Sequence, residues 1–123
     1  RGDGRALNWL VKAPDGLLIQ GDARLLARLI DNLLSNAARH AKTRVQLSLY
    51  QDGKRIGLAV EDDGDGIPEE KRQNIFAPFV SVTTGGSAGL GLAICREIAD
   101  HHHAEIGAES SALGGAKMLL IMG

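Results

Sequence analysis

Hydrophobic side chains recur with the period of an α-helix from residue 22 to about residue 41, which is the longest periodic stretch in the chain. At 100° per residue they fall on one broad arc, formed by Leu26, Leu29, Ile30, Leu33, Leu34, Ala37 and Ala41. Asp22 is a residue type favoured at helix N-caps. We therefore predict a helix that begins after Asp22 and packs this arc on a core.

The opposite arc of the predicted helix is polar and consists of Arg24, Arg28, Asp31, Asn32, Ser35, Asn36 and Arg39. Such an arc is usually a solvated face. Within it, Asn32, Asn36 and Arg39 form one stripe, because positions four and seven residues apart return to nearly the same angle. Asparagine is a mediocre helix former, and its carboxamide oxygen suits a Mg²⁺ ion that already carries phosphates and waters. The stripe suggests such a site without deciding between the two interpretations.

Alternating hydrophobic and polar residues predict strands in much of the remaining chain. Residues 44–51 and 55–62 form the clearest hairpin, around an Asp-Gly-Lys turn. Residues 105–109 and 116–122 form a second hairpin around Leu-Gly-Gly, which closes the predicted sheet.

The other segments are shorter. Residues 6–12 and 17–20 are extended candidates separated by a Pro-Asp-Gly turn signal, and they predict an edge hairpin or a strand followed by a short connection. A short helix is predicted at Pro68, because proline is tolerated in a first helical turn, and a longer one over about 90–102. Residues 80–88 lack periodicity and charge and contain two adjacent glycines, which predicts a mobile loop and a candidate lid.

The strand at 55–62 ends in a carboxylate whose direction can be predicted. Asp62 has the same parity as the apolar residues of this strand, so its side chain points to the buried side, whereas Glu61 and Asp63 point away and should be solvated. A buried carboxylate is costly unless charge-assisted hydrogen bonds compensate it, and no basic residue lies nearby in sequence. A ligand's amino group is a candidate partner; the alternative is an aspartate that caps a turn.

Glycines stand at both candidate ligand-binding segments. Gly64 and Gly66 follow Asp62, permit positive φ and let the backbone approach a flat ligand. Gly89 and Gly91 open the helix over 90–102, and a glycine-lined helix N-terminus suits phosphate. This second segment is not a P-loop, because it lacks the Lys and the Ser or Thr that follow the final glycine there.

Composition and charge argue against several classes of function. The chain of 123 residues predicts one domain, and its net charge of −1 with one Trp, one Tyr and two Phe argues against nucleic-acid binding. Cys95 is predicted to be a buried small hydrophobe, and three consecutive histidines at 101–103 lack the partners of a tetrahedral metal site. No apolar run approaches a membrane span and no signal peptide opens the chain. The first residue, Arg1, suggests a fragment of a longer protein.

In order and spacing these motifs resemble the catalytic ATP-binding domain of a sensor histidine kinase, in the wider family of gyrase, Hsp90 and MutL ATPases. The N box is similar to residues 32–40 (NLLSNAARH), the first glycine box to 62–66 (DDGDG), the F box to 76–79 (FAPF) and the second glycine box to 89–91 (GLG). The resemblance covers about residues 6–122. It implies an α+β fold, a two-layer sandwich in which a mixed, mainly antiparallel sheet of about five strands is covered on one face by about three helices (the Bergerat fold), in a single ATP-binding domain over 1–123.

The resemblance also implies a role for each matching residue. Asn36 would be the Mg²⁺ ligand, Asn32 a neighbour of the phosphates, Arg39 a phosphate contact and His40 a neighbour of the nucleotide. Asp62 would accept a hydrogen bond from the adenine amine. The other expected nucleotide contacts are Gly64, Gly66 and Ile67 at the base, Gly89 and Gly91 at the phosphates, and Phe79, Leu90 and Leu92.

The expected activity is transfer of the γ-phosphate of Mg–ATP to a histidine on a separate helical hairpin of the same dimeric kinase, which in turn serves a response regulator. None of the four histidines of the chain matches the sequence context of that acceptor, so the chain should not phosphorylate itself. The resemblance implies the cytoplasmic part of a membrane-anchored sensor, with no direct membrane contact by this domain. The candidate lid lacks Lys and Arg, which leaves more of the phosphate contact to Arg39.

Two alternatives remain open. One is an ATP-hydrolysing switch of the gyrase, Hsp90 or MutL type; these relatives place a glutamate where this chain has Asn32, and an amide cannot take a proton, which favours a kinase. The other is a nucleotide-binding regulatory module, such as a serine kinase.

Overall fold

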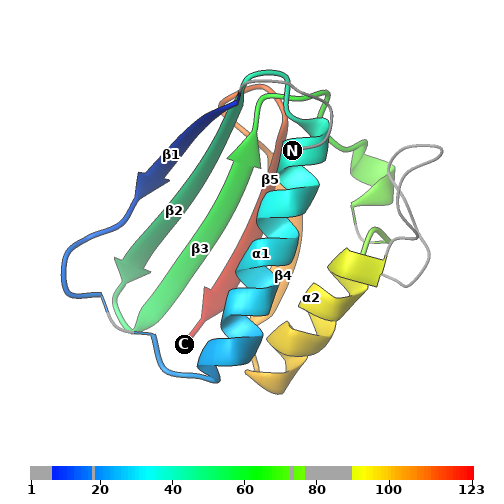
Figure 1. The fold of residues 1–123 in the computed structure, drawn as a ribbon. Coiled ribbons are helices and arrows are strands. Elements are labelled where there is room, and N and C mark those ends of the chain that lie inside the picture. Colours follow the sequence, from blue (N-terminus) through cyan, green and yellow to red (C-terminus); the bar gives the residue numbers. More distant parts are fainter. Residues whose placement is uncertain (1–6, 18, 73, 77–89) are drawn as a thin grey trace.

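A five-stranded mixed sheet and two helices form the described part of the chain, residues 7–17, 19–72, 74–76 and 90–123 of a computed structural model (Figure 1). The sheet order is β1-β2-β3-β5-β4, and only β1 and β2 pair in parallel. The strands are β1 (Asn8–Lys12), β2 (Arg44–Asp52), β3 (Arg55–Asp62), β4 (Glu105–Ser110) and β5 (Ala116–Met122). The expected α+β class and five-stranded, mainly antiparallel sheet are confirmed.

Both α-helices lie on one face of the sheet (Figure 1). They are α1 (Ala23–His40) and α2 (Leu90–His101), and a single 3-10 turn, η1 (Glu69–Lys71), follows Pro68. Against the expected three helices, the described residues therefore contain two α-helices and one short turn. Neither helix in this part of the chain is long and apolar enough to cross a membrane.

The start of α1 is capped as predicted. The Asp22 carboxylate accepts hydrogen bonds from the N–H groups of Arg24 and Leu25, at 3.0 and 3.1 Å. This satisfies N–H groups that have no partner inside the helix. The cap therefore sets where α1 begins, and with it the place of every residue on the asparagine stripe.

The core lies between the helices and the sheet. Leu29, Leu33 and Ala37 of α1 are buried, in agreement with the helical arc, and they pack in one cluster with residues of β3, β5 and α2, which include Leu58, Val60, Met118, Leu120, Cys95 and Ile98. Cys95 is fully buried, as predicted, and burial raises the pKa of its thiol to about 12. Its thiol is therefore not ionised near neutral pH.

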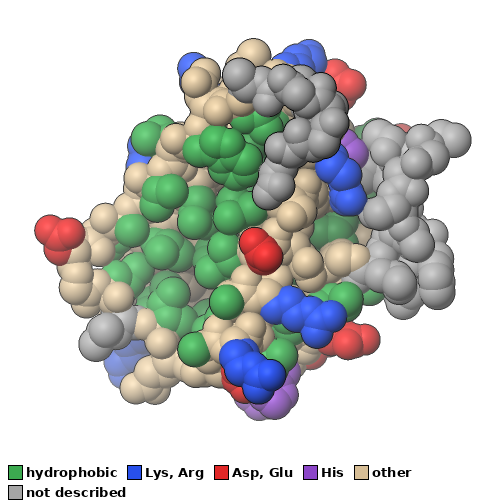
Figure 2. Space-filling view, in the orientation of Figure 1, with side chains coloured by type: hydrophobic (Ala, Val, Ile, Leu, Met, Phe, Trp, Pro, Cys, Tyr) green, Lys and Arg blue, Asp and Glu red, His purple; other side chains and the backbone are tan. Residues whose placement is uncertain are grey.

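The β1 edge is the weakly covered side of the sheet. β1 pairs in parallel with β2, and residues 17, 19 and 20 are not in a strand. Of the two predictions for this segment, the edge hairpin is therefore wrong, and the strand followed by a short connection is confirmed. Trp9 and Val11 remain 49% and 65% exposed. Figure 2 shows hydrophobic side chains gathered over β1 to β3, beside α1.

Candidate functional site

Asp62 stands at the end of β3 and is only 3% exposed, which confirms the predicted direction of its side chain. Its Oδ1 accepts hydrogen bonds from the N–H groups of Gly64 (2.9 Å) and Ala116 (3.3 Å). No described residue donates to Oδ2. The carboxylate therefore caps the turn with one oxygen and keeps the other available for a ligand, so the two interpretations of Asp62 are compatible.

Burial raises the pKa of the Asp62 carboxyl, while the N–H groups of Gly64 and Ala116 and the nearby His40 lower it without cancelling the rise. Desolvation disfavours the charged form of a buried acid. An additional N–H donor from a ligand would stabilise the ionised form of Asp62. The site is thus suited to a ligand that presents an amine to Oδ2.

Three glycines make this arrangement possible. A Cβ at Gly64 would lie 2.1 Å from the carbonyl oxygen of His40, and one at Gly115 would lie 2.3 Å from Oδ1 of Asp62. Gly66 has a φ of +80°, a conformation that residues with a side chain rarely adopt. The end of α1, the end of β3 and the turn between β4 and β5 can therefore all meet at Asp62.

The two neighbours of Asp62 are partly exposed, but their carboxylates are held by hydrogen bonds and are not fully solvated as predicted. Asp63 accepts hydrogen bonds from the segment that follows α1, because the chain bends sharply after β3. Glu61 is half-buried on the other face of the sheet, where its carboxylate accepts hydrogen bonds from Ser111 (2.8 Å) and Gln46 (3.4 Å).

Within the asparagine stripe, Asn32 contacts α2, Asn36 is buried and Arg39 is exposed. Asn36 is only 5% exposed, and its Oδ1 accepts a hydrogen bond from the Arg39 guanidinium at 3.3 Å. The amide of Asn32 donates to the carbonyl oxygen of Gly91, in the first turn of α2, at 3.4 Å. The fold thus brings together Asn32, Asn36, Arg39 and Gly91, which are separated by as many as 59 residues in sequence.

The remaining predicted nucleotide contacts lie at different places in the fold, and some of them are not described by the structure. His40 is the last residue of α1, and burial lowers its pKa while Asp62 opposes this effect. Ile67 and Leu92 are buried in the hydrophobic core. Leu90 begins α2. The predicted contacts Phe79 and Gly89, the side chain of Leu90 and the candidate lid at 80–88 lie outside the described residues.

Three residues at the site have a role that the sequence did not reveal: Asp63, Ser111 and Gly115. The Ser111 hydroxyl accepts a hydrogen bond from Leu113 N–H, and Gly115 N–H donates to the Asp62 carbonyl at 3.1 Å. The turn around Gly115 was predicted, but its contact with Asp62 spans more than fifty residues. The only available signal was the pair of glycines before β5.

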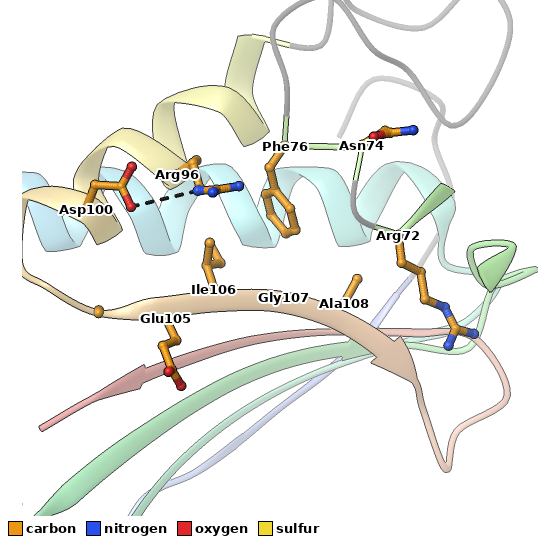
Figure 3. Close-up of a pocket in the computed structure, with 10 residues that line it drawn as sticks. Arg72, Asn74, Phe76, Arg96, Asp100, Glu105, Ile106, Gly107 and Ala108 are labelled. Atoms are coloured by element: carbon orange, nitrogen blue, oxygen red, sulfur yellow. Dashed lines mark ion pairs between the residues drawn. The ribbon is translucent and has the colours of Figure 1, made fainter. Parts of the chain in front are cut away.

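A separate hollow of about 650 Å³ lies between α2 and β4 (Figure 3). Phe76 and Ile106 point into it, and Arg96 and Asp100 form an ion pair at its side, at 3.8 Å. Arg72 is held by the Ile67 carbonyl and the Ser110 hydroxyl, at 3.0 and 2.9 Å. No described residue of the predicted site lines this hollow, so it is distinct from the site at Asp62.

Comparisons with known proteins agree with this geometry. The chain is 45% identical over 111 residues to the sensor protein RstB of Escherichia coli, an alignment that covers 81% of this chain and 25% of RstB. The solved structure of the mycobacterial sensor histidine kinase MprB matches with a TM-score of 0.82 and 28% identity over 94% of this chain and 80% of that one. The ATP-binding domain of PrrB from Mycobacterium tuberculosis matches with a TM-score of 0.78 and 34% identity, over 94% and 79% of the two chains.

Residues 21–122 match the family of histidine kinase-, DNA gyrase B- and HSP90-like ATPases, and the chain belongs to that family. Within it, the similarity to MprB and to the PrrB domain identifies the histidine kinase branch and its catalytic ATP-binding domain. The resemblance drawn from the motifs is confirmed. The chain spans about a quarter of the length of RstB.

Proposed function

We propose that this chain binds Mg–ATP with the adenine at Asp62 and the phosphates at the asparagine stripe, and that it donates the γ-phosphate to a histidine on a helical hairpin of the full-length kinase. The observation that carries the proposal is the buried Asp62 carboxylate, which is bonded through one oxygen and has the other available. The exocyclic amine of adenine is a donor of the required kind. The similarity to the solved ATP-binding domain of PrrB supports the choice of nucleotide.

At the phosphate end the residues fit a nucleotide-borne metal ion. In the described part of the chain no group of three or more His, Cys, Asp or Glu side chains could hold a metal. A single carboxamide oxygen, that of Asn36, fits an ion whose other ligands are phosphate oxygens and waters. Bound Mg²⁺ would neutralise phosphate charge. Arg39, which already donates to Asn36, would then also contact phosphate oxygens.

The chain's own contribution to phosphoryl transfer is positioning and charge compensation, which is the main requirement of this chemistry. Asp62 orients the base, and Asn36 and Arg39 orient the phosphates. Asn32 donates its amide hydrogen to Gly91 and cannot accept a proton from water. An amide at this position cannot act as the general base for water, which argues against an ATP-hydrolysing switch.

The partners follow from the same proposal. The direct partner is the histidine-bearing hairpin of the same dimeric protein, and a response regulator receives the phosphoryl group from that hairpin. The domain works in the cytoplasm, as part of a larger sensor. It makes no contact with nucleic acid.

The test is to mix the chain with the separately expressed hairpin of its full-length protein, ATP and Mg²⁺, and to measure acid-labile phosphate on the hairpin. We expect transfer with the unaltered chain and a loss of at least tenfold with Asn36→Ala, on the order of one charged hydrogen bond or more. Asn36→Ala should weaken ATP binding more with Mg²⁺ than without it. Steady release of phosphate to water with none on the hairpin would contradict the kinase assignment, and equal weakening in both conditions would contradict the metal role.

A further inference from the structure

Asp63 gathers more hydrogen bonds than any other described carboxylate, and none of them involves the proposed ligand. We propose that Asp63 is a positioning residue for base recognition, which holds the segment after α1 against the end of β3 and so sets the place of the Asp62 carboxylate. The inference rests on the proposed function, because it concerns how the adenine site is assembled.

The contacts of Asp63 are short and converge from one segment. Its Oδ1 accepts hydrogen bonds from the N–H groups of Lys42 (2.8 Å), Thr43 (3.0 Å) and Arg44 (3.1 Å). Its Oδ2 accepts from the Thr43 hydroxyl at 2.6 Å, and the N–H of Asp63 donates to the Arg44 carbonyl at 3.3 Å. Three successive N–H groups on one carboxylate fix the conformation of residues 42–44.

That connection bears directly on Asp62. It joins His40 at the end of α1 to Val45, which pairs with Asp62 across the sheet. The His40 carbonyl oxygen packs so closely on Gly64 that a Cβ there would lie 2.1 Å from it. Gly64 in turn donates the 2.9 Å hydrogen bond to Asp62 Oδ1. A shift of residues 42–44 would therefore move Val45, the strand partner of Asp62, and the His40 carbonyl that packs on Gly64. Both changes would displace the Asp62 carboxylate.

Electrostatics and positioning predict opposite results for the removal of Asp63. Partial burial raises the pKa of Asp63, but the hydrogen bonds from Thr43, Arg44 and Lys42 outweigh it and hold the pKa well below the usual range. Asp63 is thus anionic at neutral pH, and its charge disfavours ionisation of Asp62. If only charge mattered, its loss would favour the ionised Asp62 and strengthen the binding of an anionic nucleotide. If Asp63 is a positioning residue, its loss weakens base recognition.

The experiment compares ADP with inosine diphosphate, which has a carbonyl in place of the exocyclic amine of adenine, by calorimetry on the 123-residue chain. We expect the unaltered chain to prefer ADP, and Asp63→Ala to reduce this preference about tenfold while it changes the affinity for inosine diphosphate less than about twofold. Thr43→Val removes only the hydroxyl contact and should reduce the preference for ADP about threefold. This variant replaces Asp63→Ala in the experiment if Asp63→Ala does not fold.

The matched control is Asp65→Asn. Asp65 carries the same charge two positions away, but its side chain is 94% exposed, and among the described residues it forms an ion pair with Lys42 alone, at 3.4 Å. It should leave both affinities within about twofold, since exposed ion pairs contribute little.

Three results would contradict the positioning role of Asp63. Tighter binding of ADP by Asp63→Ala would overturn the inference in favour of a purely electrostatic role. A lower melting temperature with the ADP preference intact would overturn it in favour of a purely structural role. If the unaltered chain shows no preference for ADP, the adenine assignment of Asp62 itself fails, and the inference falls with it.

Discussion

The two ends of the proposed nucleotide site are built from different parts of the chain. At the base end, backbone groups from three segments close on Asp62, and Gly64 and Gly115 leave no room for a Cβ. At the phosphate end, side chains of α1 meet each other and the first turn of α2 through longer hydrogen bonds of 3.3 and 3.4 Å. The base end is therefore expected to depend on backbone position, and the phosphate end on side-chain chemistry.

The largest effect is expected from Gly64→Ala, which tests the backbone packing of the base end. The new Cβ would lie 2.1 Å from the His40 carbonyl oxygen, a backbone atom that cannot turn away. Overpacking of this kind costs about 1–3 kcal/mol and more where backbone must shift. Urea denaturation should show at least this loss in the free energy of unfolding.

The control for Gly64→Ala is Gly107→Ala, in β4. Nothing lies within 4 Å of a Cβ at Gly107, so the change in the free energy of unfolding should be under about 1 kcal/mol. If the two variants were equally stable, the close approach of α1 to Gly64 would not be a requirement of the fold.

Asp62→Ala tests the ligand contact at the base end. We expect ADP to bind about 1.5–3 kcal/mol more weakly, which is the scale of a hydrogen bond to a charged group. Isothermal titration calorimetry measures this directly. An unchanged affinity would place the adenine elsewhere.

A smaller effect is expected in the pH dependence of stability. It tests whether the ionised Asp62 carboxylate destabilises the folded domain when no ligand is bound. Because burial raises the Asp62 pKa in the folded state, the native state binds more protons than the unfolded one between the usual value of 3.8 and the raised pKa. Stability from Asp62 therefore falls as pH rises through this window and stays lower above it.

Asp62→Asn removes that titration and keeps an oxygen that can accept from Gly64 and Ala116. Above the window, the variant should melt at a higher temperature than the unaltered chain in the absence of nucleotide, although it binds ADP more weakly. The melting temperatures of the variant and the unaltered chain are compared over a range of pH. If their difference does not change with pH, ionisation of Asp62 does not destabilise the free domain.

Local patterns were sufficient for the elements and for one site residue. The period of α1, its cap at Asp22 and the hairpin of β2 and β3 depend on residues that are close in sequence. The direction of Asp62 follows from the same alternation that identifies β3. Gly64 and Gly66 were predicted as site glycines from their position alone, but the steric reason for Gly64, the carbonyl of His40, lies 24 positions away.

The sequence by itself determined where α1, α2 and the strands β2 to β5 lie, that Asp62 is buried, and to which family the motifs belong, because each of these depends on periodicity or on a short motif. Only the tertiary structure decided that Asn36 is buried, that Asp63 binds the segment after α1, and that Gly115 packs on Asp62. The hydrogen bonds of Asp63 cross 19 to 21 residues and that of Ala116 to Asp62 crosses 54. No local pattern reports which distant N–H groups will meet a carboxylate, because that depends on how the layers pack together.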